Sequence, residues 1–205
     1  MKRDLSDIGT SVDRASSIIK RGGVCAFPTE TGYGLGALFD NEEALKRIFE
    51  IKKRPENKPL LLLIESFDNA PVDMKRVPKI VKRLTHKFWP GPLTLLLPAK
   101  GGLSFYLTGN TGKIGVRISS NPIAMELVKK VSKPITATSA NLSGKTLPKD
   151  INEVVEQLKD PAPDYFLDGG SIEKGPASTI VDVSSNKIKI IREGAVKKED
   201  ILALC

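Results

Sequence analysis

The chain has 205 residues, of which 40% are hydrophobic and 27% are charged. These proportions exclude a disordered chain, a collagen-like repeat and a disulfide-stapled miniprotein, and they predict one domain, or two at most, with a buried core. The net charge of +8 comes from one segment, because residues 46–100 hold 13 basic and 5 acidic side chains while the other 150 residues hold 19 of each sign. We therefore expect residues 46–100 to face something anionic.

Helical periodicity predicts five helices along the chain. Asn41 can cap a helix whose first turn is acidic, and Pro55 ends that helix because it disfavours helical geometry before it. Pro78 suits the first turn of another helix, and Asp150 begins the pattern of a capping box. The predicted helices are 11–21, 41–53, 78–88, 121–131 and one that starts at Asp150.

Apolar runs of strand length lie between and after these helices. They do not follow the regular βαβ rhythm of a doubly wound nucleotide-binding fold, and the last strands are consecutive. We therefore predict an α/β fold with a single-domain, twisted mixed sheet that contains parallel and antiparallel pairs. The predicted strands are 24–27, 60–64, 93–97, 114–118, 134–138, 165–168, 178–184 and 187–192, with a turn at Ser185-Asn186 between the last two.

Cysteine, histidine and hydropathy patterns restrict the compartment and the chemistry. Cys25 and Cys205 are the two cysteines; they make no disulfide framework and suit a reducing cytosol, so a cytoplasmic protein is expected. The apolar run Leu60–Ile64 is far too short to cross a bilayer, and the charged N-terminus lacks the core of a secretion signal, so no membrane is expected. His86 is the single histidine, which excludes a multi-histidine metal site and argues against a Ser-His-Asp relay.

Two segments come close to known nucleotide-binding motifs. Ser139–Thr146 resembles the P-loop pattern GxxxxGK[ST], but a serine stands at its first position and Pro148 falls where the loop must become a helix. Gly32, Gly34 and Gly36 are spaced GxGxG rather than GxGxxG. Neither segment is therefore interpreted as a P-loop or a dinucleotide-binding fingerprint.

Polar residues gather instead at the ends of predicted strands. In PTETGYGLG (28–36) the glycines would let the backbone turn closely around a ligand, and a threonine-rich tight turn is the alternative. KKRPENKP (52–59) gathers cations at a helix end; compensation of the helix dipole accounts for one or two of them, but not for Arg54 and Lys58 beyond the helix. TATSANLSG (136–144) can bind ribose or phosphate oxygens, or form an ordinary helix-capping loop.

Three further polar residues lie on or beside predicted strands. Arg117 stands in the otherwise apolar strand 114–118, where a cation must point outward or pair with an anion because unpaired burial is costly. Ser178 and Arg192 flank the last two strands and offer hydroxyl and guanidinium groups.

Seven segments follow one another in a specific order. They are PTETGYGLG (28–36), KKRPENKPL (52–60), WPGPLTLLL (89–97), GVRI (115–118), TSANLSG (138–144), STIVD (178–182) and REGAV (192–196). This order closely resembles the YrdC-like threonylcarbamoyl-AMP synthases. The resemblance implies a YrdC-like catalytic domain at 8–196 and a C-terminal tail at 197–205, with no additional C-terminal domain.

The resemblance also implies an activity and a site. In the family a twisted mixed sheet with flanking helices surrounds a large basic concave cavity. The expected activity is that of a nucleotidyltransferase, an L-threonylcarbamoyladenylate synthase, which makes threonylcarbamoyl-AMP and pyrophosphate from L-threonine, bicarbonate and ATP. A downstream threonylcarbamoyl-transfer complex would then modify the tRNA adenosine next to the anticodon. Mg²⁺ is expected with ATP, held mainly by phosphates, and no dedicated metal site is expected in the protein.

Motif by motif, the resemblance implies roles for individual side chains. Threonine would be bound by hydroxyl and guanidinium groups of Thr29, Arg117 and Ser178. Lys52 and Arg54 would be the catalytic cations, since the reaction needs alignment and charge neutralisation more than proton relays. The nucleotide-binding set would be Lys52, Arg54, Lys58, Thr138, Ser139, Asn141, Ser143 and Arg192.

Two other functions remain open from the sequence. An RNA-binding or translation-assembly module could use the basic surface for tRNA or double-stranded RNA, because no acidic residue occurs from 75 to 100. The basic residues meant are Lys75, Arg76, Lys79, Lys82, Arg83 and Lys87. If they form the solvated face of an amphipathic helix, their charges need no partner. The second function that remains open is that of a carbamoyl-transfer domain like those in hydrogenase maturation.

Overall fold

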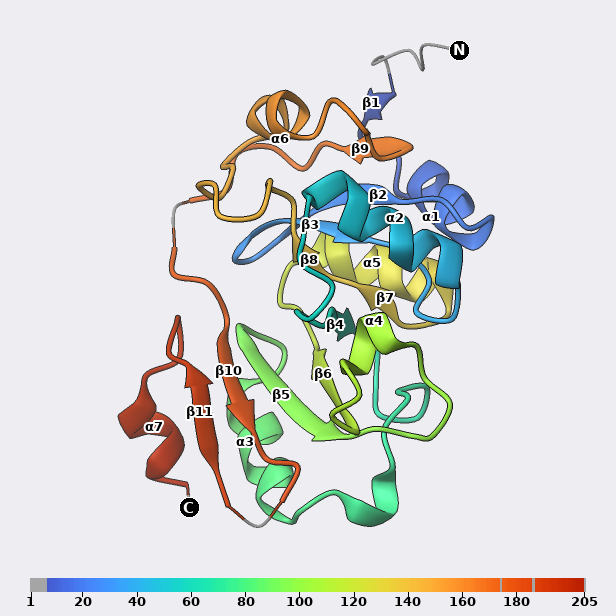
Figure 1. Cartoon of the computed structure of the whole chain (residues 1–205). Coiled ribbons are helices and arrows are strands. Elements are labelled where there is room, and N and C mark those ends of the chain that lie inside the picture. The colour runs from blue at the N-terminus through green and yellow to red at the C-terminus, as the bar shows by residue number, and fades with distance from the viewer. Residues whose placement is uncertain (1–6, 174, 186, 205) are drawn as a thin grey trace.

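The computed structural model of the chain describes residues 7–173, 175–185 and 187–204, and its strands belong to two mixed sheets (Figure 1). The strands are β1 (Ile8–Gly9), β2 (Cys25–Thr29), β3 (Gly32–Gly36), β4 (Leu61–Leu63), β5 (Leu93–Pro98), β6 (Lys113–Arg117), β7 (Ile135–Thr136), β8 (Thr138–Ser139), β9 (Tyr165–Leu167), β10 (Thr179–Asp182) and β11 (Lys189–Arg192). Asn186 of the predicted turn and Cys205 lie outside the described residues.

Parallel and antiparallel pairs occur in both sheets. The five-stranded sheet has the order β1-β9-β2-β3-β8, and the six-stranded sheet has the order β11-β10-β5-β6-β4-β7. In the first sheet β2 runs antiparallel to β3 and parallel to β9, and in the second β5 runs antiparallel to β6 and parallel to β10. The predicted α/β fold with a mixed sheet is thus confirmed, with its strands divided between two sheets.

All five predicted helices form, and the caps predicted at Asn41 and Asp150 are confirmed, whereas the helix predicted from Pro78 begins at Ile80. Asn41 Oδ1 accepts a hydrogen bond from the backbone N–H of Ala44 at 3.0 Å, and Asp150 Oδ1 accepts one from Glu153 at 3.0 Å. The helices are α1 (Val12–Lys20), α2 (Glu42–Lys52), α3 (Ile80–Phe88), α4 (Phe105–Thr108), α5 (Pro122–Val131), α6 (Ile151–Gln157) and α7 (Lys198–Leu202). The short helices α4 and α7 were not predicted, because four or five residues show little periodicity.

The glycine-rich segment 28–36 contains the end of β2, a two-residue turn and β3, so it forms a β-hairpin, and its Gly32 and Gly34 line a cavity. Glu30 and Thr31 form the turn between β2 and β3. β3 pairs in register with β2, from Gly32, with φ of +136°, opposite Thr29 to Gly36 opposite Cys25. Gly36 is required by packing, since a Cβ atom there would lie 2.7 Å from a ring carbon of Phe27. Glycine thus serves close packing of the sheet more than ligand contact at this position.

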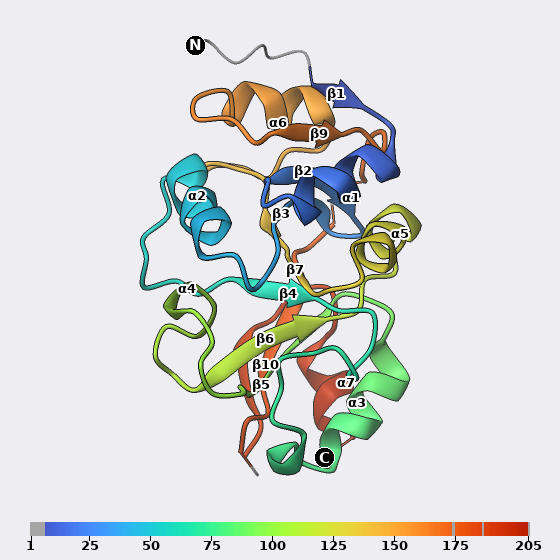
Figure 2. The ribbon, with the colours of Figure 1, turned by 90° about the vertical axis from the view of Figure 1, so that its right-hand side faces the viewer.

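The two sheets share one hydrophobic core. Tyr33 and Leu35 of the five-stranded sheet belong to the same buried cluster as Leu62, Leu93 and Val116 of the six-stranded sheet. Figure 2 shows the two sheets stacked one above the other in this view, with α1 and α5 on one side of the molecule and α2 on the other. The shared core makes the described chain a single domain.

The structure bears on the environment of Cys25 and on the expectation that no segment spans a membrane. Cys25 is fully buried between the sheet and α1, and burial raises the pKa of its thiol, which makes it an inert core residue. Among the described residues no helix has the length and apolar character that crossing a bilayer requires.

Candidate functional site

A cavity of about 590 Å³, lined by apolar side chains together with charged and hydroxyl groups, opens where strand ends of both sheets meet. This volume lies within the usual range of small-molecule sites. Four cations line it, while the only carboxylate on its lining is that of Asp182, which binds the ammonium of Lys113 at 2.6 Å. The cavity is therefore suited to an anionic ligand. The lining cations are Arg54, Lys113, Arg117 and Arg192.

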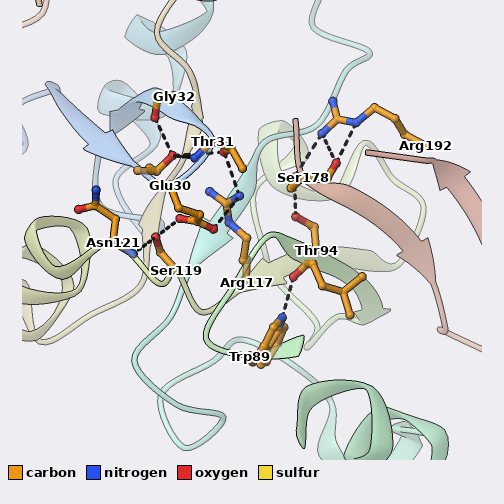
Figure 3. Close-up of polar contacts among 12 residues, drawn as sticks. Glu30, Thr31, Gly32, Trp89, Thr94, Arg117, Ser119, Asn121, Ser178 and Arg192 are labelled. Atoms are coloured by element: carbon orange, nitrogen blue, oxygen red, sulfur yellow. Dashed lines mark hydrogen bonds and ion pairs between the residues drawn. The ribbon is translucent and has the colours of Figure 1, made fainter. Parts of the chain in front are cut away.

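Arg117, the last residue of β6, brings a nearly fully buried guanidinium to the cavity wall. Its Nη1 donates to Thr31 Oγ1 at 3.2 Å and lies 3.4 Å from Glu30 Oε1 (Figure 3). The other oxygen of Glu30 accepts a hydrogen bond from the buried Ser119 hydroxyl. Desolvation lowers the pKa of Arg117, and the Glu30 carboxylate acts in the opposite direction.

The Arg117 guanidinium retains unused hydrogen-bonding capacity. Its Nε atom is buried and has no hydrogen-bond partner among the described residues. A buried N–H without a partner is costly, and a guanidinium binds carboxylates or phosphates through two parallel hydrogen bonds. Arg117 is thus held by Glu30 and Thr31 with donor capacity left for a planar anion.

Ser178, just before β10, joins the far wall of the cavity through a small hydrogen-bond network. Its Oγ accepts from Thr94 Oγ1 at 3.1 Å and from Arg192 Nη2 at 3.2 Å, and its carbonyl accepts from Arg192 Nη2 at 2.8 Å (Figure 3). Because a hydroxyl oxygen has two lone pairs and one proton, the two acceptor positions of Ser178 are filled and its proton is left to donate. Ser178 can therefore act as a donor toward a ligand oxygen.

Lys52, at the end of α2, is buried behind the cavity and does not line it. Its ammonium donates to the carbonyl of Ser139 and to the carbonyl of Asn141 at 2.7 Å, and it lies 3.2 Å from Asn141 Oδ1. The Lys52 carbonyl in turn accepts from the backbone N–H of Ser143 at 2.9 Å. Lys52 therefore fixes the shape of the 139–143 loop, whose Ser139 faces the cavity.

The burial of Lys52 predicts a pH-dependent stability. Desolvation, followed by the charge of Arg54, lowers the pKa of Lys52 from 10.5 to about 7. Between these two pH values the unfolded chain binds more protons at this site than the folded chain, so the free energy of unfolding rises with pH. Lys52→Met removes the titration. We expect wild-type stability, measured by urea unfolding, to rise relative to Lys52→Met from pH 7 to pH 9; parallel curves would contradict the assignment.

Arg54 crosses the loop after α2 and reaches the cavity. Its Nε donates to the carbonyl of Lys58 at 2.9 Å and its Nη2 to the carbonyl of Pro59 at 3.1 Å, which holds the guanidinium in place. Partial burial lowers its pKa. Lys58 itself is exposed, and its side chain is not part of the cavity lining.

The structure brings most of the predicted site residues together. Those that line the cavity are Thr29, Arg54, Arg117, Thr138, Ser139, Ser178 and Arg192. Lys52, Lys58, Asn141 and Ser143 do not line it. Asn141 is buried beside Lys52, and its Nδ2 donates to the carbonyl of Lys145 at 2.6 Å, whereas Ser143 is exposed. The Thr29 hydroxyl donates to the carbonyl of Gly32 at 2.6 Å and so helps to close the β2–β3 turn.

Sequence reasoning missed several polar residues of the cavity. Thr94 and Lys113 lie on β5 and β6, inside or next to apolar runs, and Asp182 arrives through the parallel pairing of β10 with β5. Alternation gives some signal, since Thr94 is a polar residue in an otherwise apolar strand. Glu30 and Thr31 stand in the 28–36 motif, but nothing in that motif indicates their contact with Arg117.

The fold and the cavity together define a class of protein: an α/β domain with a cationic small-molecule site between two mixed sheets. The family model for Sua5, YciO and YrdC proteins, described as telomere recombination, matches residues 17–194. The chain belongs to the Sua5/YciO/YrdC family.

Several curated relatives carry the same name. A threonylcarbamoyl-AMP synthase of Pyrococcus abyssi is 39% identical over 187 residues, which is 91% of this chain and 55% of the relative. A threonylcarbamoyl-AMP synthase of Bacillus subtilis is 36% identical over 202 residues, or 98% of this chain and 58% of the relative. The chain thus spans little more than half the length of these two proteins.

Solved structures of two family members have the same fold as this chain. Pyrococcus abyssi Sua5 complexed with L-threonine superposes with a TM-score of 0.85 at 36% identity, covering 94% of this chain and 56% of that protein. Escherichia coli YciO superposes with a TM-score of 0.79 at 25% identity, covering 95% of this chain and 96% of YciO. The fold of the described domain is therefore that of its family.

Proposed function

We propose that this protein is an L-threonylcarbamoyladenylate synthase, which forms threonylcarbamoyl-AMP and pyrophosphate from L-threonine, bicarbonate and ATP. The observation that carries the proposal is the buried Arg117 guanidinium, with an unpartnered Nε, at the wall of a cavity that three more cations line. The relatives named threonylcarbamoyl-AMP synthase and the Sua5 complex with L-threonine support it.

The Arg117 side of the cavity would receive threonine. Arg117 would bind the substrate carboxylate through charge-assisted hydrogen bonds, for which its Nε is available. Thr31, which contacts Arg117, and Ser178, which has a proton to donate, would place hydroxyls around the bound amino acid. Such an arrangement leaves the α-amine of threonine free to react.

The remaining cations would receive ATP. Arg54 lies beside the cavity with its guanidinium fixed by two carbonyls, so it can meet a phosphate without losing much side-chain entropy. Arg192 and the 138–139 strand would contact the nucleotide from the other walls. Lys52 would act as a positioning residue that holds the 139–143 loop. This role differs from the phosphate-binding role that its motif implies.

The chemistry requires two bond-forming steps. The threonine amine attacks the carbon of CO₂ formed from bicarbonate, loses a proton and becomes a carbamate. A carbamate oxygen then attacks the α-phosphorus of ATP, the bond from that phosphorus to the bridging oxygen breaks, and pyrophosphate leaves. Negative charge builds on the phosphates throughout, so fixed guanidinium groups lower the barrier by charge neutralisation and alignment.

Mg²⁺ would enter with ATP. Hard cations of this kind prefer several oxygen ligands, and among the cavity-lining residues the only carboxylate is Asp182, which is paired with Lys113. We therefore propose that phosphate oxygens and water hold the ion and that the protein binds the complex through its cations.

The product would be passed to a threonylcarbamoyl-transfer complex that modifies tRNA next to the anticodon. We place the reaction in the cytoplasm, where ATP and tRNA are available.

The test is a pyrophosphate assay on the purified chain with ATP, Mg²⁺ and bicarbonate. We expect pyrophosphate release that requires L-threonine and is not supported by L-valine, which has the same shape but lacks the hydroxyl. Release without threonine, or no release at all, would overturn the proposed function.

A further inference from the structure

A second cleft, of about 1220 Å³, lies between α3, α5 and the loop that contains Glu65, Ser66 and Phe67. No residue lines both this cleft and the cavity described above. Figure 2 shows α3 and α5 on the same side of the molecule, one below the other. The cleft is larger than the usual small-molecule site, so its size suits a segment of a macromolecule.

Part of the second cleft is apolar. This apolar part, which we call the floor, consists of Phe67, Trp89, Ile118, Pro122 and Met125. The Phe67 and Trp89 rings pack with centroids 5.5 Å apart, and the indole Nε1 of Trp89 donates to the carbonyl of Leu93 at 2.6 Å. A fixed aromatic wall beside a flexible methionine is the kind of surface that binds an inserted apolar side chain.

The rim of the cleft is cationic and uncompensated. Three cationic residues stand on it against one acidic residue, Glu65. None of the three makes an ion pair with another residue in the part of the chain that the structure describes. Their charges are therefore available to a partner. The three are Lys82 and Arg83 on α3 and Lys129 on α5.

We propose that this cleft is a docking site for an acidic segment of a partner protein, which inserts an aromatic or aliphatic side chain between Phe67 and Met125. Charge complementarity with the three rim cations selects an acidic partner, and the apolar part of the cleft provides the anchor pocket. An amphipathic helix or an extended strand with apolar residues on one side and carboxylates on the other has this chemistry.

The floor favours a protein segment over RNA. Bases bind proteins without sequence preference mainly by stacking on open aromatic faces. Phe67 and Trp89 are tilted by 33° against each other, so each ring already covers part of the other. The side chains of Ile118, Pro122 and Met125 supply no hydrogen bond for a base edge. Of the hydroxyls that also line the cleft, those of Ser66, Thr85 and Ser119 already donate within the chain. The basic run that the sequence analysis left open is thus assigned in part, through Lys82 and Arg83, to a protein contact.

The experiment is a random-peptide display selection on the full chain, followed by titration of the enriched peptides. The rim variant is Lys82→Glu with Lys129→Glu. The matched control is Lys46→Glu with Lys198→Glu, which changes the net charge equally at exposed positions on α2 and α7. Trp89 is the single tryptophan of the chain and lines the cleft, so its emission reports occupancy directly.

We expect enriched peptides to combine several carboxylates with one aromatic or large aliphatic residue and to shift the Trp89 emission. Their affinity should fall at least about tenfold in the rim variant and stay unchanged in the control variant. No enrichment, peptides without acidic bias, or equal binding to both variants would overturn the proposal.

A second titration, with RNA in place of the peptide, tests whether the cleft binds RNA instead of protein. A single-stranded RNA of about 16 nucleotides, whose bases are free to stack, and a duplex of about 16 base pairs, the length that double-stranded RNA-binding domains span, are each titrated under the same conditions. We expect no shift of Trp89 emission. A shift in the wild type that disappears in the rim variant would identify the cleft as an RNA site and refute the protein partner. The result does not depend on the synthase activity, because the cleft and the cavity share no lining residue.

Discussion

Replacing Arg117 with alanine is expected to abolish threonine-dependent pyrophosphate release and to lower the free energy of unfolding by about 3–5 kcal/mol, the usual cost of breaking a buried ion pair. Activity is lost because Arg117 is the buried guanidinium at the proposed threonine carboxylate position. Stability is lost because Glu30, with an oxygen 3.4 Å from Arg117 Nη1, is left without its cation. Urea unfolding and the pyrophosphate assay measure the two effects.

A second substitution separates stability from binding. Adding Glu30→Gln to Arg117→Ala removes the uncompensated carboxylate, so part of the lost stability should return. The activity should not return, because no guanidinium meets the substrate. If the Arg117→Ala protein, or the double variant, retained the wild-type KM for threonine, the assignment of Arg117 as the carboxylate clamp would be wrong.

Replacing Arg54 with alanine is expected to lower kcat/KM for ATP by about 10- to 150-fold, which corresponds to the 1.5–3 kcal/mol of one charge-assisted hydrogen bond. The effect should fall on ATP and leave the KM for threonine nearly unchanged. Stability should change little, because Arg54 contacts only two carbonyls of a surface loop. Steady-state kinetics with each substrate varied in turn measure the split.

Lys58→Ala is the matched comparison for Arg54→Ala. Both residues belong to the KKRPENKP segment, and the sequence predicts phosphate contacts for both. Only Arg54 lines the cavity, whereas Lys58 is exposed. We therefore expect Lys58→Ala to remain within about threefold of the wild type, since exposed charges contribute little. Equal losses in the two variants would contradict the placement of Arg54.

The helices and most strands could be predicted from the sequence because their signals are local. Asn41 and Asp150 are caps that act on neighbours three residues away, and both form the predicted hydrogen bonds. The division into two sheets could not be predicted, because it depends on pairings such as β5 with β10, which join residues far apart in the chain. The strand Gly32–Gly36 was missed because its glycines suggest a loop, whereas here Gly36 makes room for Phe27.

The sequence predicted which residues belong to the candidate site better than it predicted where their side chains lie. Motif resemblance selected Arg54, Arg117 and Ser178, and all three line one cavity. It could not distinguish Lys52 from Arg54, which are two residues apart, because the direction of a side chain at the end of α2 depends on the 139–143 loop packed behind it. The contact of Glu30 with Arg117 joins two segments that are distant in sequence, and no periodicity reports such a contact.

Isotope tracing of the nucleotide product tests the central claim most directly. The purified chain is incubated with ATP, Mg²⁺, L-threonine and ¹³C-labelled bicarbonate, and the products are analysed by mass spectrometry. Formation of threonylcarbamoyl-AMP predicts an adenylate that contains threonine and is one mass unit heavier than the product from unlabelled bicarbonate, with one pyrophosphate released per adenylate. An adenylate without the label, or ADP and phosphate as the only products, would contradict the account.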